Sequence, residues 1–90
     1  MITKRFFISG RVQGVSFRYY TQRAANRLGI KGFVRNLPDG RVEVLARADE
    51  EALSEFYSFL RDGPPAARVD HIETKEETSD QELHSFQIKF

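Results

Sequence analysis

The sequence predicts an α+β fold in which two helices cover one face of a β-sheet. Two observations lead to this prediction. Segments with the period of a strand and segments with the period of a helix follow one another in the order strand, helix, strand, strand, helix, strand. The chain also has only 90 residues, which supply one modest core and not two. We therefore expect a single domain over residues 1–90.

Two hydrophobic periods predict the first strand and the first helix. Residues 5–12 alternate between the two faces of a strand. Residues 16–28 place apolar side chains at steps of three and four, which is the period of a helix. Ser16 stands where an N-cap is expected, and Gly29 stands just past the predicted end.

A hairpin and a second helix follow. Residues 30–36 and 41–48 are predicted as two strands, and the sequence LPDG between them has the composition of a turn. Asp49 is a suitable N-cap for a helix over residues 50–62, whose first turn carries two glutamates. Gly63 and the two prolines after it end this helix.

The end of the chain predicts two further strands, at residues 68–75 and 84–90. Val69 and Ile72 are three residues apart, so simple alternation fails there and we expect a β-bulge. The charged stretch at residues 76–82 is predicted to be a solvated turn.

Together these elements form two βαβ units that share one sheet. The fold class predicted is the ferredoxin-like α/β sandwich, βαββαβ, with a four- to five-stranded antiparallel sheet and both helices on one face. Right-handed crossovers place the first and third strands side by side in its centre.

The stretch GRVQGVSFRYY, residues 10–20, joins the first strand to the first helix and is typical of a local anion site. The first amides of a helix lack intrahelical partners, and the helix dipole favours negative charge there. Gly14 allows these amides to converge, and Arg18 can add a forked guanidinium. The alternative is that Gly14 marks an ordinary turn and that Arg18 is merely solvated.

The position of Arg18 favours the anion site. A cation beside the positive end of a helix dipole costs roughly 0.3–1 kcal/mol unless an anion compensates it. The stretch lacks both the Gly-x-x-x-x-Gly-Lys-Ser/Thr sequence and the third glycine of a dinucleotide turn, so we do not expect mononucleotide handling.

Two motifs at a suitable interval carry a family resemblance. GRVQGVSFR at residues 10–18 is followed, after one helix, by GFVRNLPDGRVEV at residues 32–44. The chain resembles the acylphosphatases, small enzymes that hydrolyse the mixed anhydride of a carboxylic acid and phosphate. The resemblance covers the chain from end to end. It implies an acyl phosphate as substrate, inorganic phosphate as product, and neither a cofactor nor a metal.

The resemblance also implies roles for particular residues. It assigns substrate binding to Arg18 and orientation of the attacking water to Asn36. It assigns the phosphate cradle to backbone amides up to Arg18, in a loop made of Gln13, Gly14, Val15, Ser16 and Phe17. Family members commonly carry a glycine where this chain has Ala48, a departure that concerns the local backbone path more than the activity.

These residue types suit the reaction on physical grounds. The leaving group is a carboxylate, so the enzyme needs no strong general acid; it must neutralise phosphoryl charge and place a water in line. An arginine and an amide cradle do the first. An asparagine carboxamide, which both donates and accepts, does the second, with a phosphoryl oxygen as the proton acceptor. Taken alone, Asn36 would be interpreted as a turn residue, and only its pairing with the first motif reverses that preference.

The composition limits the kinds of partner that we expect for the chain. Fourteen basic and thirteen acidic residues give a net charge of +1, cysteine is absent, and no apolar run exceeds four residues. The N-terminus lacks the pattern of a signal peptide. We expect a cytoplasmic monomer with no nucleic-acid or membrane partner. His71 and His84 have no clustered partners and are expected to face water rather than a metal.

Two alternatives remain open at this stage. Ferredoxin-like sheets also bind RNA through exposed aromatics, and KGFV at residues 31–34 matches part of the RNA-recognition signature. Acylphosphatase-like modules also resemble the N-terminal part of large carbamoyl-transfer enzymes that mature hydrogenases. This chain begins with Met1 and ends after its last predicted strand, which favours a free-standing enzyme.

Overall fold

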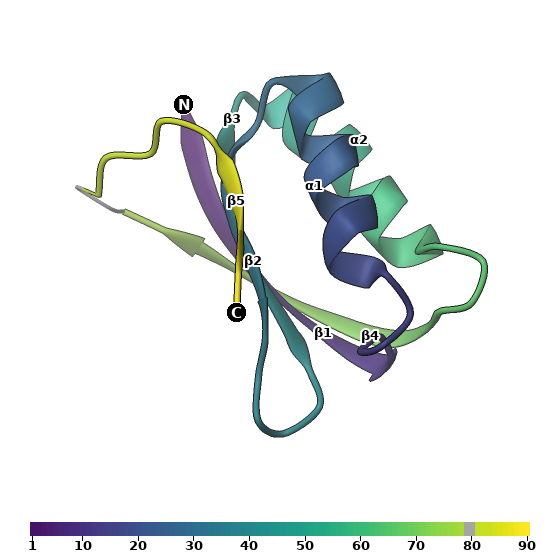
Figure 1. The fold of residues 1–90 in the computed structure, drawn as a ribbon. Helices are drawn as coiled ribbons and strands as arrows, with labels where there is room; N and C mark the ends of the chain where they lie inside the picture. The colour runs from purple at the N-terminus through teal and green to yellow at the C-terminus, as the bar shows by residue number, and fades with distance from the viewer. Residues whose placement is uncertain (79–80) are drawn as a thin grey trace.

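The structure is a computed structural model that describes residues 1–78 and 81–90. Both helices cover one face of a five-stranded sheet, which confirms the predicted α+β sandwich (Figure 1). The elements follow in the order β1 (Ile2–Arg11), α1 (Phe17–Leu28), β2 (Lys31–Asn36), β3 (Val42–Ala48), α2 (Glu50–Asp62), β4 (Arg68–Glu77) and β5 (Phe86–Lys89).

The sheet has the strand order β4-β1-β3-β2-β5, with β1 beside β3 in the centre as predicted. Strand β3 is antiparallel to both of its neighbours, and its Val42 lies opposite Ile8 of β1 and Asn36 of β2. Strands β1 and β2 therefore run in the same direction. Their carboxyl ends meet at the same edge of the sheet, where β1 leads into α1 and β2 leads into the hairpin turn.

The prediction of an antiparallel sheet is wrong for the edge strand β5, which runs parallel to β2 with Phe86 opposite Gly32. Besides its pairing with β2, β5 makes one named contact with each helix. The ring of Phe86 packs edge-to-face on Phe56 with centroids 6.0 Å apart, and Gln22 Nε2 donates to the carbonyl of Phe86 at 3.2 Å. The sheet is consequently mixed, and β5 ends at the same edge as β1 and β2.

Strand β4 contains the predicted bulge. Its pairing with β1 passes from His71 opposite Ser9 to Val69 opposite Gly10, so one residue of β4 has no counterpart. β4 extends to Glu77, two residues beyond the prediction. Residues 79 and 80 of the predicted charged turn lie outside the described residues.

The core lies between the sheet and the helices. Side chains on one face of β1 and β3 meet one apolar stripe from each helix, and the fully buried members of this core include Phe6, Ile8, Phe17, Val42, Val44, Leu53, Phe56 and Leu60. The cap predicted for α2 is present, because the side chain of Asp49 accepts from the amide of Ala52 at 2.8 Å. Gly29 ends α1 at φ 71°, also as predicted.

Candidate active site

A pocket of about 270 Å³ opens at the sheet edge where β1 and β2 both end. Arg18 reaches it from the first turn of α1, and Asn36 reaches it from the last position of β2. The pocket is lined by Val12, Gly14, Ser16, Phe17, Arg18, Tyr19 and Asn36. Five of the seven residues predicted for the site therefore lie around one cavity.

The loop between β1 and α1 exposes a row of unpaired amides. Gly14 has φ 73° and open space where a Cβ would stand, and Ser16 is the only non-glycine residue with positive φ in the described ranges, at 63°. A left-handed residue beside a right-handed one turns successive amides to the same side. Throughout the described chain, no hydrogen bond uses the backbone amides of residues 14–19 as donors. These amides are therefore available to an anion.

The cap expected from Ser16 is not made. Ser16 occupies the N-cap position, but its left-handed backbone differs from the extended geometry of a capping serine and its side chain makes no cap hydrogen bond. A left-handed non-glycine residue costs roughly 1–3 kcal/mol, and such strain is typical of ligand-binding loops. The helix start is thus left open at its positive end.

The guanidinium of Arg18 lies in the pocket without an acidic partner in residues 1–78 and 81–90. Its Nη1 donates to the carbonyl of Lys89 at 3.5 Å, and its guanidinium carbon lies 4.6 Å from the centroid of the Phe90 ring. The first turn of α1 contains no acidic residue. The side chain is therefore held by the end of β5 while its charge stays uncompensated.

Asn36 lines the same pocket, and its side-chain oxygen is buried. Its Oδ1 has no hydrogen-bond partner among the residues described. A buried carbonyl oxygen without a partner costs about 1–3 kcal/mol, so the position is unfavourable for stability unless a ligand or water is bound. Such an oxygen can accept a hydrogen bond from a water placed between it and an anion on the amides.

Gln13 and Val15 do not line the pocket. Val15 packs partly against the core. The side chain of Gln13 turns toward the β2–β3 hairpin, where its Nε2 donates to the carbonyls of Leu37 at 2.8 Å and Arg41 at 2.9 Å. Gln13 thus ties the amide loop to the turn that follows Asn36. The family resemblance assigns a role only to the backbone of Gln13, and nothing in the spacing of the motif predicts these side-chain hydrogen bonds.

Replacing Gln13 by alanine is expected to lower kcat for an acyl phosphate by about tenfold or more, because the loop and Asn36 lose their common anchor. The two hydrogen bonds lost should also cost about 1–2 kcal/mol of the free energy of unfolding. Steady-state kinetics and chemical denaturation measure the two effects. Asp49→Ala is the control, since it removes one side-chain-to-backbone hydrogen bond at the start of α2, away from the pocket. Equal losses of kcat in both variants would contradict a positioning role for Gln13.

Three residues at the pocket were not singled out as functional from the sequence. Tyr19 is 64% exposed and lines the pocket. Lys89 and Phe90 contact Arg18 only because β5 runs parallel to β2, which the sequence did not predict.

The remaining sequence candidates lie away from the pocket. His71 and His84 are exposed, as expected. No group of three His, Asp or Glu side chains is placed to hold a metal in the part of the chain that the structure describes. Ala48 is buried at the end of β3 opposite Ile2 and does not line the pocket.

RNA binding by a ferredoxin-like sheet would need exposed aromatic rings on the sheet face opposite the helices. Phe33 is only 7% exposed, and Lys89 Nζ lies 4.1 Å from its ring centroid. Arg41 and Lys75 stand over the ring of Phe7 at 4.9 and 5.6 Å. Both rings are thus covered by side chains of the protein, which does not favour their use as stacking platforms.

Comparison with known proteins gives the family. The family model described as Acylphosphatase matches residues 4–88. The chain belongs to the acylphosphatase family. An acylphosphatase from Archaeoglobus fulgidus is 46% identical over 90 residues, with 100% of both chains covered. The crystal structure of acylphosphatase from Bacillus subtilis is 40% identical, with a TM-score of 0.96 and 100% of both chains covered.

The acylphosphatase fold also occurs within a longer chain. HypF of T. kodakarensis is 33% identical with a TM-score of 0.88, and the match covers 100% of this chain but 12% of that one. Among the described residues, neither α1 nor α2 is long and apolar enough to cross a membrane.

Proposed function

We propose that this acylphosphatase-family protein hydrolyses the carboxyl-phosphate anhydride of acyl phosphates to a carboxylate and inorganic phosphate. The observation that carries the proposal is the pocket at the start of α1. Around it lie unpaired amides, the guanidinium of Arg18 without an acidic partner, and Asn36, whose carboxamide oxygen is buried and unpartnered among the described residues. Each of these groups is unfavourable in the free protein and is compensated by an anion with a water beside it.

In the proposed mechanism, the amides of residues 13–18 and Arg18 hold the phosphoryl oxygens. Their dipoles and charge are fixed before the reaction, so they stabilise the transition state without reorganising. Asn36 Oδ1 accepts a hydrogen bond from the attacking water and holds it in line with the scissile bond. The water oxygen bonds to phosphorus, the phosphorus–acyl oxygen bond breaks with its electron pair leaving on the carboxylate, and a phosphoryl oxygen takes the water proton.

The test is hydrolysis of acetyl phosphate and benzoyl phosphate with inorganic phosphate as competitor. We expect both to be hydrolysed, phosphate to inhibit competitively because it occupies the cradle, and a chelator to leave the rate unchanged. Absence of hydrolysis, inhibition by phosphate that is not competitive, or activity that depends on an added divalent metal would each contradict the proposal.

The proposal includes the setting of the enzyme. We infer a cytoplasmic monomer that binds no nucleic acid. The net charge of +1 and the covered rings of Phe7 and Phe33 support this inference. Sedimentation tests the monomer. A titration with single-stranded RNA at two salt concentrations tests the binding, because real binding would weaken steeply as salt rises.

A further inference from the structure

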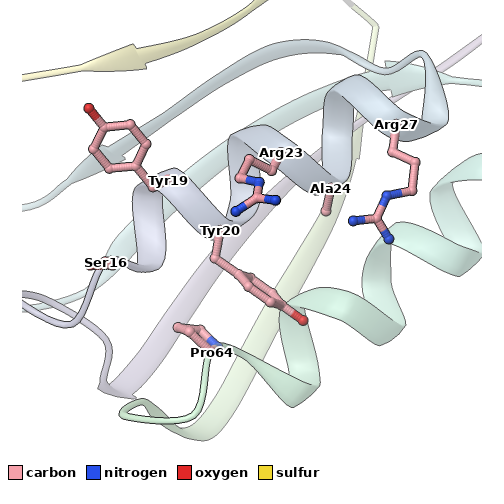
Figure 2. Close-up of a pocket in the computed structure, with 7 residues that line it drawn as sticks. All are labelled: Ser16, Tyr19, Tyr20, Arg23, Ala24, Arg27 and Pro64. Atoms are coloured by element: carbon pink, nitrogen blue, oxygen red, sulfur yellow. The ribbon is translucent and has the colours of Figure 1, made fainter.

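A second hollow, of about 370 Å³, lies between α1 and the loop that follows α2 (Figure 2). It shares Ser16 and Tyr19 with the pocket of the candidate active site, so the two hollows meet at the first turn of α1. The residues that line it are Ser16, Tyr19, Tyr20, Arg23, Ala24, Arg27 and Pro64. The proposed mechanism uses the phosphate end of the substrate only and leaves this hollow without a role.

The helical residues of this hollow form one face of α1. Ser16, Tyr19, Tyr20, Arg23 and Arg27 recur at steps of three and four, which brings them into line. The helix rises by about 10 Å from Ser16 to Arg23 at 1.5 Å per residue. A group that begins at the phosphate cradle and follows this face therefore reaches Arg23 after the length of an aromatic or extended acyl group.

The far end of the hollow is positively charged. Arg23 and Arg27 are four residues apart, and like charges at this spacing destabilise a helix. Arg27 lies with its guanidinium carbon 5.4 Å from the ring centroid of Phe59, and Arg23 makes no ion pair or hydrogen bond within the described residues. No acidic residue lines the hollow. Figure 2 shows the side chains of Tyr20, Arg23 and Arg27 on the same side of α1, with the ring of Tyr20 directed toward α2.

The floor of the hollow is rigid and largely apolar. The ring of Tyr20 packs against Phe17 and Phe59, with centroids 6.5 and 6.3 Å away, and Ala24 and Pro64 complete this surface. Burial and the nearby charge of Asp62 raise the pKa of the Tyr20 phenol, so at neutral pH it stays protonated and is a donor. The hollow thus offers an apolar wall near the cradle and donors at its far end.

We propose that this hollow binds the acyl part of the substrate and that Arg23 and Arg27 select acyl groups carrying a second carboxylate. The inference rests on the proposed function, since the phosphate must occupy the neighbouring cradle. Guanidinium groups match the planar carboxylate and hold it by charge-assisted hydrogen bonds. The substrates preferred are then the monophosphates of dicarboxylic acids.

The experiment compares 4-carboxybenzoyl phosphate with 4-carbamoylbenzoyl phosphate, which has the same shape without the second charge. We expect the unsubstituted protein to prefer the carboxylate by severalfold in kcat/KM, chiefly through KM, because the contact is remote from the reacting bond. Arg23→Gln and Arg27→Gln should each reduce this preference by roughly threefold, and the double variant should abolish it. Arg61→Gln is the matched control, because it removes the same charge from an exposed position in the last turn of α2.

The outcomes separate the two proposals. Similar turnover of both substrates by the unsubstituted protein, or a preference that survives in the double variant, overturns the carboxylate-binding hollow and leaves the proposed function standing. A preference lost equally in Arg61→Gln also overturns it, since the effect would then reflect net charge alone. If neither these two substrates nor benzoyl phosphate is hydrolysed, the proposed function fails and the inference fails with it.

Discussion

Replacing Arg18 by alanine is expected to lower kcat/KM for benzoyl phosphate by about 10³-fold without lowering the stability of the fold. The guanidinium has no acidic partner in the described chain and contacts only the Lys89 carbonyl and the Phe90 ring. It also lies in the first turn of α1, where a cation costs roughly 0.3–1 kcal/mol. The measurements are steady-state kinetics and the midpoint of thermal unfolding. Activity should collapse while the midpoint stays level or rises.

Two further variants make the Arg18 result specific. Arg18→Lys keeps the charge but loses the forked guanidinium. Its kcat/KM should therefore lie between the values of the unsubstituted protein and of Arg18→Ala, and its affinity for inorganic phosphate should be weaker than that of the unsubstituted protein. Arg11→Ala removes an equal charge from an exposed position at the end of β1 and should change kcat/KM by less than about threefold. Near-normal turnover by Arg18→Ala would exclude a direct role for this side chain.

The meeting of Arg18 and Asn36 could be predicted in outline because it follows from topology. Once β1 and β2 are both placed antiparallel to β3, their carboxyl ends must lie at one edge. The loop after β1 and the last residue of β2 are then neighbours, whatever the details of the side chains. The motifs identify the two residues, and the strand order brings them to the same edge of the sheet.

The contacts around this pair could not be predicted in the same way. Strand β5 is only four residues long, and a segment of that length carries no signal for its direction or its neighbour. Its place depends on Phe86 packing against Phe56 and on the hydrogen bond from Gln22, which are contacts between distant parts of the chain. The contacts of β5 and Phe90 with Arg18 could therefore not be predicted from the sequence. The same holds for the hydrogen bonds from the Gln13 side chain to the β2–β3 hairpin.

At the pocket, the chain departs from the usual preferences for backbone conformation, charge at a helix start and hydrogen bonding of buried polar atoms. Ser16 has a left-handed backbone, Arg18 opposes the helix dipole, and the oxygen of Asn36 is buried without a partner. Elsewhere the sequence follows the rules, as at the Asp49 cap and the Gly29 stop. Several unfavourable choices gathered in one cavity are expected of a site shaped by its ligand rather than by stability.

Replacing Asn36 by alanine is expected to lower kcat by about 10²–10³-fold with little change in the inhibition constant of inorganic phosphate. The amides and Arg18 still bind the phosphate, but the water loses the oxygen that holds it in line. Since Asn36 Oδ1 has no hydrogen-bond partner to lose and its burial is itself unfavourable, the free energy of unfolding should stay level or rise. Kinetics with phosphate as inhibitor, together with denaturation, measure all three quantities.

The aspartate variant of this position separates water orientation from simple space filling. Asn36→Asp keeps the size and the accepting oxygen, but above about pH 5 it adds a negative charge beside the bound phosphate. The inhibition constant of phosphate should therefore rise severalfold at neutral pH and recover as the pH falls toward the pKa of the new carboxyl group. In Asn36→Ala that constant should instead follow the value for the unsubstituted protein over the same range, because only the ionisation of phosphate itself then changes with pH. If both variants weaken phosphate binding equally and leave kcat intact, Asn36 shapes the cradle and the water must be oriented by another group.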